Sequence, residues 1–122
     1  MDAKEYLEQY VKLLKTVKLC MNELQQENQN EKIAESIADE LIKYLDEMQS
    51  IHNLLFSIPL GKANEILVLH LRYIQGKSWE ETCSRFSESM RQVKRYHAAG
   101  LKLVQKILDS NEGVTQVKHK NP

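Results

Sequence analysis

The sequence predicts an all-α fold: a helical hairpin over residues 1–60, a bundle of shorter helices over residues 61–109 and a flexible tail over residues 110–122. Apolar residues recur at spacings of three and four, the period of an amphipathic helix. Alternation of apolar and polar residues, the pattern of a half-buried strand, does not occur along the chain. Two helix-capping signals in the second half mark where its helices begin.

The hairpin is predicted from two stretches with the same apolar period. The first ends at Leu24, a polar segment over residues 25–30 follows, and the second stretch ends before Pro59 and Gly61. This arrangement indicates two antiparallel helices with a coiled-coil-like seam. The predicted seam consists of Leu7, Tyr10, Leu14, Val17, Met21 and Leu24, with Ala34, Ile37, Leu41, Tyr44, Met48, Ile51, Leu55 and Ile58.

Further apolar residues beside this seam make each stripe wider than one partner helix would cover. They are Val11, Leu13, Ile33, Ile42, Leu45, Leu54 and Phe56. The second half of the chain can cover some of them, and a second copy could cover the rest as a four-helix bundle. We therefore expect a homo-oligomer, most simply a dimer.

After Pro59 and Gly61, an apolar third helix is predicted over about residues 62–75 and should be the buried one. Gly76 is expected to end it as a C-cap. A short helix over 79–86 should then bury Trp79, Cys83 and Phe86.

Two capping boxes define the starts of the last two helices. Ser78 is followed three residues later by Glu81, and Ser89 is followed three residues later by Gln92. Two helix starts separated by a short turn are typical of a helix-turn-helix.

The helix that begins after Ser89 has two distinct faces. One face is apolar and consists of Val93, Tyr96, His97, Gly100, Leu101, Leu103, Val104, Ile107 and Leu108. The other face is basic and consists of Arg91, Lys94, Arg95, Ala98, Lys102, Gln105 and Lys106. No acidic residue lies between Glu88 and Asp109, so ion pairs within the helix cannot explain the cations. Gly100 lies on the apolar face, where we expect it to allow close packing of another helix.

Charge is divided unevenly between the halves of the chain, although the formal net charge is zero. Residues 1–61 contain 6 Lys and Arg against 11 Asp and Glu, and residues 62–122 contain 11 against 6. The halves therefore carry net charges of −5 and +5. A polyanion such as double-stranded DNA would be attracted to the second half.

Other function classes have less support in the sequence. Four scattered histidines, two cysteines without metal-ligand spacing and the absence of a glycine-rich phosphate loop argue against an enzyme, a metal site or a cofactor. No apolar run approaches the roughly 20 residues of a membrane span, and the first residues lack a signal-peptide pattern. We expect a cytoplasmic protein of a bacterial host cell, without membrane contact.

The segment L-R-Y-I-Q-G-K-S-W-E-E-T-C-S-R-F-S-E-S-M-R-Q-V-K-R-Y-H-A-A-G-L-K-L, from Leu71 to Leu103, resembles region 4 of sigma-70-type factors. It is more similar still to the sigma-region-4-like small transcriptional regulators of phages and prophages of Gram-positive bacteria. The resemblance implies a helix-turn-helix that binds DNA. It implies that the start of the recognition helix faces DNA and that the preceding helix lies near phosphates. The residues at the start of the recognition helix are Ser89, Arg91, Gln92, Lys94 and Arg95, and those near the phosphates are Lys77 and Trp79.

The chemistry of these side chains agrees with that role. Arg91, Lys94 and Arg95, at the N-terminal end of the helix, are expected to enter the major groove. Arginine pairs with guanine there and glutamine with adenine, so the arginines and Gln92 are candidates for reading bases. Lys77, Lys102 and Lys106 are candidates for phosphate contacts, and the tail adds Lys118 and Lys120.

We therefore expect a sequence-specific regulator of transcription that acts at phage promoters, with RNA polymerase as a candidate partner of the acidic hairpin. Two alternatives stay open. One is a phage DNA-packaging protein of the small-terminase type, which would form a large ring rather than a dimer. The other is an adaptor whose basic face binds an acidic protein instead of DNA.

Overall fold

The computed structural model describes residues 1–26 and 30–120, with side chains described up to Asn111. These residues are helical and contain no strand, which confirms the predicted all-α class. In chain order the elements are α1 (Ala3–Gln26), α2 (Glu31–Phe56), the 3-10 turn η1 (Leu60–Lys62), α3 (Ala63–Leu69), the π-helical turn η2 (His70–Ile74), α4 (Trp79–Cys83) and α5 (Met90–Lys120).

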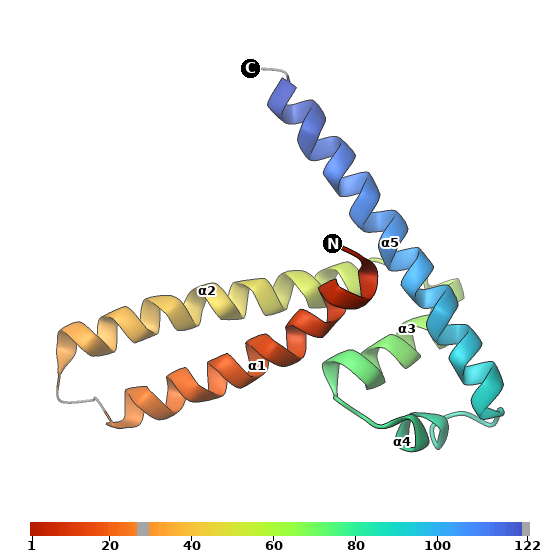
Figure 1. Ribbon diagram of the computed structural model, residues 1–122, viewed down its shortest axis with the longest axis horizontal. Helices are drawn as coiled ribbons and strands as arrows, with labels where there is room; N and C mark the ends of the chain where they lie inside the picture. Colours follow the sequence, from red (N-terminus) through yellow and green to blue (C-terminus); the bar gives the residue numbers. More distant parts are fainter. Residues whose placement is uncertain (27–29, 121–122) are drawn as a thin grey trace.

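Helices α1 and α2 lie side by side and antiparallel, and α5 crosses one end of the pair (Figure 1). Asn30 caps α2, because its side-chain oxygen accepts a hydrogen bond from the Ile33 N–H at 3.3 Å. The predicted seam residues Leu7, Val17, Ile37, Met48, Ile51, Leu55 and Ile58 are buried.

Met21 departs from the predicted seam, because 52% of its surface is exposed, while the neighbouring Cys20 is buried. Ile33 on α2 is exposed as well. Both residues belong to the turns nearest the connection between the helices, far from α3 and α5 (Figure 1). The apolar period alone does not show that, toward one end of the hairpin, no other helix covers the seam residues.

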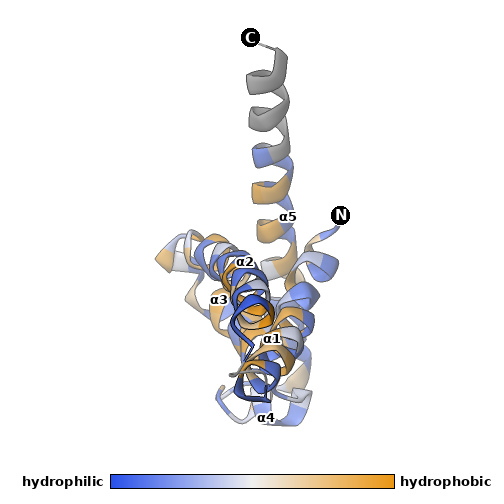
Figure 2. Cartoon of the chain, turned by 90° about the vertical axis from the view of Figure 1, so that its left-hand side faces the viewer, coloured by the Kyte–Doolittle hydropathy of each residue, from blue (hydrophilic) through white to orange (hydrophobic). Residues whose placement is uncertain are grey.

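One hydrophobic cluster joins elements from both halves of the chain. Its buried members are Ala3, Leu7, Ile51, Leu55, Ile58, Ile66, Leu69, Tyr73 and Val104. In the end-on view of Figure 2, apolar residues gather where α1, α2 and α3 meet. Residues on both sides of the boundary expected near residue 60 thus pack in the same core.

The predicted third helix is present but not regular. It consists of η1, α3 and η2, and the π-helical turn closes with a 3.0 Å bond from the Gln75 N–H to the His70 carbonyl. Ile66, Val68, Leu69, Leu71 and Tyr73 are buried, so it is the core helix as expected. Gly76 follows with φ +68°, the left-handed conformation predicted for a C-cap.

Helix α4 is shorter than the predicted helix over 79–86. After Cys83 the backbone forms tight i→i+3 bonds, such as Phe86 N–H to the Cys83 carbonyl at 3.0 Å. The Ser84 hydroxyl also donates to the Glu81 carbonyl at 2.6 Å, which competes with a further helical turn. Thr82 is the fully buried residue here, whereas Trp79, Cys83 and Phe86, which we expected to be buried, are half-buried.

Helix α5 packs closely against α3 at Gly100. A Cβ atom at this position would lie 3.0 Å from Leu69 Cδ1 and 3.3 Å from the Glu65 carbonyl oxygen. The predicted packing role of Gly100 is therefore confirmed. Farther along α5, the Gln105 side chain accepts a 2.7 Å hydrogen bond from the Ala3 N–H, which ties the start of α1 to α5.

Helix α5 does not end near Leu108 as predicted but continues to Lys120. No proline occurs between Pro59 and Pro122, and one glycine inside a helix costs only about 1 kcal/mol. Once a helix has formed, adding one more residue costs little free energy. The loss of the apolar period after Leu108 therefore does not mark the end of α5. The side chains of Lys118 and Lys120, the suggested phosphate contacts, lie outside the described residues.

The close approach at Gly100 leads to a first prediction. Gly100→Val should destabilise the protein by about 1–3 kcal/mol, because the added carbons overpack the contact with Leu69 and the Glu65 backbone. The matched control is Ala99→Val, at an exposed position of the same helix, which should change stability by less than about 1 kcal/mol. Urea unfolding followed by circular dichroism measures both, and equal losses would contradict the packing role of Gly100.

Candidate nucleic-acid interface

The basic face predicted for α5 points into solvent. All five cations of this face are exposed: Arg91, Lys94, Arg95, Lys102 and Lys106. On the opposite face, Val93, Gly100 and Val104 are buried. Among the described residues, the ion pairs are Lys4–Glu8 and Lys77–Glu81, so none of the five cations on α5 is paired. The face is therefore an array of uncompensated positive charge along a straight helix.

The start of α5 is unusual for a helix N-terminus. The Gln92 N–H donates to Ser89 Oγ at 3.2 Å, so Ser89 caps the helix. The return bond of a full capping box is not formed among the described residues; here the prediction was only half correct. The first turn contains no acidic residue and carries Arg91 instead. Because the N-terminal end of a helix favours anions, a cation in the first turn lowers helix stability.

Helix α4 holds Trp79 beside this basic face. Both hydrogen bonds of the predicted capping box are present: Glu81 N–H donates to Ser78 Oγ at 3.1 Å, and Ser78 N–H donates to the Glu81 carboxylate at 3.2 Å. These bonds lower the pKa of the Glu81 carboxyl. Trp79 follows Ser78 directly, so the box fixes where its ring projects.

Two cations lie over the Trp79 ring. Arg72 Cζ is 4.5 Å and Lys94 Nζ 5.5 Å from the ring centroid. Cation–π attraction at such distances contributes about 0.5–1 kcal/mol at an exposed site. Of the predicted site residues, Trp79 and Lys94 are therefore brought together directly. Lys77 lies on the same side but is half-buried and pairs with Glu81 at 3.9 Å, so its charge is partly compensated.

Arg72 is a member of this site that the sequence analysis missed. Its Nη1 donates to the Lys77 carbonyl at 2.6 Å, and its Nε is buried without a partner among the described residues. A signal was available: Arg72 is the only charged residue in the apolar run from Ile66 to Ile74. An isolated charge in a predicted core helix usually has a specific partner.

His97 connects the basic face to the core. Its Nε2 lies 2.7 Å from the Tyr73 hydroxyl oxygen in a hydrogen bond, and its ring packs edge-on against Trp79 at 5.0 Å. Burial lowers the pKa of His97, and the charges of Arg72 and Lys4 lower it further. Through these contacts, the His97 side chain of α5 joins η2 and α4.

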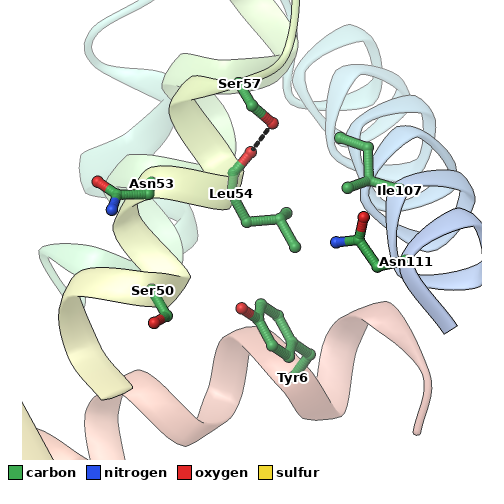
Figure 3. A pocket seen from close by; sticks show the side chains of 7 residues that line it. All are labelled: Tyr6, Ser50, Asn53, Leu54, Ser57, Ile107 and Asn111. Atoms are coloured by element: carbon green, nitrogen blue, oxygen red, sulfur yellow. Dashed lines mark hydrogen bonds between the residues drawn. The ribbon is translucent and has the colours of Figure 1, made fainter. Parts of the chain in front are cut away.

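A separate groove lies on the other side of the core, between α1, α2 and α5 (Figure 3). Tyr6 and Leu54 point into it from facing helices, and Ile107 closes it from α5. Its described lining residues include no charged side chain; the polar groups they offer are hydroxyls and amides.

The pKa of His97 leads to a second prediction. Because folding lowers this pKa below its ordinary value of about 6.5, the unfolded chain takes up the proton first as the pH falls. The free energy of unfolding should therefore decrease between about pH 7.5 and about pH 5.5. Burial and the neighbouring His52 also lower the pKa of His70, which adds to the effect.

His97→Gln should reduce this pH dependence, and His97→Gln with His70→Gln should remove most of it. Urea unfolding at the two pH values measures the change. A wild-type slope in the double variant would show that other groups control acid stability.

Within the described residues, no single helix is long and apolar enough to span a membrane; a pair bent by 94°, Glu31–Phe56 with Leu60–Ile74, meets the criteria of length and composition alone. The same residues contain no group of three His, Cys, Asp or Glu side chains that could hold a metal ion. No protein-family model matches the chain, and no curated protein or solved structure matches it significantly.

Proposed function

We propose that this protein is a sequence-specific DNA-binding regulator of transcription. The observation that supports the proposal most strongly is the exposed, unpaired basic face of α5. A solvated helix of a soluble domain would usually intersperse acids among five cations, because ion pairs four residues apart stabilise it. Between Glu88 and Asp109 there are none, which favours a polyanionic ligand.

In this proposal α4 and α5 act as a helix-turn-helix, with α5 as the recognition helix. Arg91 and Arg95 lie about one turn apart near its start and are free to enter a major groove. Lys94, drawn toward the Trp79 ring, and Lys102, two turns farther along, are better placed for phosphates than for bases. Ser89 and Gln92 complete the start of the helix, with Lys77 and Trp79 beside it.

The resemblance of Leu71–Leu103 to sigma region 4 and to small phage regulators supports the same reading. A protein of that kind would act at promoters, and the acidic α1/α2 pair would be the part available to RNA polymerase. The charge division between the halves agrees with this assignment, because DNA would be repelled by the first half and attracted by the second.

A third prediction distinguishes base reading from phosphate contact. Arg91→Ala and Arg95→Ala should each weaken binding to the specific site by about 1–3 kcal/mol, while weakening binding to unrelated duplex much less. Lys102→Ala should weaken both equally and reduce the salt dependence of log K by about one unit. Fluorescence anisotropy titrations with a selected and a scrambled duplex measure these differences.

Lys43→Ala, which removes an exposed cation from α2, is the matched control and should leave DNA binding unchanged. Circular dichroism should be unchanged in all four variants. If Arg91→Ala and Arg95→Ala both bind specific DNA as the wild type does, α5 is not the reader.

A further inference from the structure

Helix α2 carries a second apolar stripe beside the seam. Its apolar members are Ala38, Ile42, Leu45 and Phe56, with the polar residues Gln49 and His52 between Leu45 and Phe56. These positions are spaced four and three residues apart, like the seam of a coiled coil. Ile42 is 57% and Leu45 46% exposed, so the middle of this stripe has no partner within the chain. A regular stripe of this kind is typical of a helix that packs against a second neighbour.

Helix α1 has corresponding positions at alternating spacings of three and four: Val11, Leu14, Lys18, Met21 and Gln25. Val11 and Leu14 are half-buried, Met21 is exposed, and Lys18 and Gln25 are exposed polar residues. In both helices the stripe positions lie just after seam positions in the sequence. Viewed from the N-terminus of each helix, the stripe is therefore rotated from the seam in the same sense. Because the helices are antiparallel, equal rotations from a shared seam lead to the same side of the pair. The two stripes therefore lie on one side.

The rest of the chain covers only one end of this side. Helix α5 packs on the opposite side, where Tyr6, Leu54 and Ile107 line the groove of Figure 3. On the stripe side, His70 of η2 contacts Phe56, with ring centroids 5.7 Å apart. What stays uncovered is the part formed by residues 11–21 of α1 and 35–46 of α2, which we call the open face.

The charges that flank the open face are of opposite sign on its two helices. Lys15 and Lys18 are exposed on α1, and Glu35, Asp39 and Asp46 are exposed on α2. Among the described residues none of these five forms an ion pair. Two copies related by a two-fold axis along the helices would place α1 of each over α2 of the other, bringing the lysines beside the acids.

We propose that the open face binds a second copy of this chain in a four-helix arrangement. The apolar stripes supply the buried contact, and the self-complementary charges select this pairing over one with α1 on α1, which would oppose like charges. Because η2 occupies the end near Phe56, the two hairpins diverge there. The interface is independent of the DNA-binding proposal, since it uses no residue of the basic face.

The test compares a pair of exposed apolar positions on the open face with one exposed apolar position outside it. Ile42→Asp with Leu45→Asp, both exposed in the monomer, should convert a dimer into a folded monomer. Leu19→Asp is the control, because Leu19 is 64% exposed but lies on the side of α1 away from the seam. Size-exclusion chromatography with light scattering measures the mass, and circular dichroism confirms the fold.

A charge exchange tests the arrangement itself. Lys18→Glu and Asp39→Lys should each weaken dimerisation about tenfold, and the double variant should recover most of the loss, as expected for a contacting pair. A wild type that stays monomeric at high micromolar concentration would overturn the proposal. So would a dimer that survives Ile42→Asp with Leu45→Asp or is lost with Leu19→Asp, and a large ring would overturn the two-copy arrangement.

Discussion

The close approach of α5 to α3 at Gly100 is the constraint on which the rest of the structure depends. With no side chain between them, Leu69 and the Glu65 carbonyl lie against the α5 backbone, and the apolar side of α5 joins the core. The opposite side is then held outward, with its cations exposed. A side chain at this point would require Leu69 and the Glu65 backbone to move aside. The His97–Tyr73 bond and the cations over Trp79 join the same α5 helix to η2 and α4.

Local signals in the sequence predicted what local chemistry controls. The Ser78 capping box, the left-handed Gly76 and the packing glycine were all identified correctly, because each requires a particular residue type at one position. What could not be predicted depends on partners distant in the chain. The Gln105 side chain, assigned to the basic face, instead accepts a bond from Ala3, and no periodicity reveals such a contact. Arg72 is a different case, because its partners, the Lys77 carbonyl and the Trp79 ring, are only five and seven residues away. Its isolated charge in an apolar run was a signal that helix periodicity alone does not interpret.

The two halves of the chain carry their charges in different arrangements. In the first half, the open face combines apolar stripes with lysines and acids on different helices, an arrangement suited to a second copy of itself. In the second half, cations lie on one helix face without acids, an arrangement suited to a polyanion. The net charge of zero reveals neither arrangement, because the binding properties of each surface depend on where its charges lie and not on their sum. If both proposals hold, each dimer presents two copies of α5.

Amide chemical-shift mapping by NMR would show whether the basic face of α5 binds duplex DNA. Adding a short mixed-sequence duplex to labelled protein should shift the amides of residues 77–79 and 89–95, with smaller shifts near Lys102, and should leave those of the open face unchanged. The shifts should decrease as salt is added, because phosphate contacts release counterions. Unchanged amide shifts over residues 89–95 at saturating DNA, or shifts concentrated on α1 and α2, would show that α5 is not the DNA-binding helix.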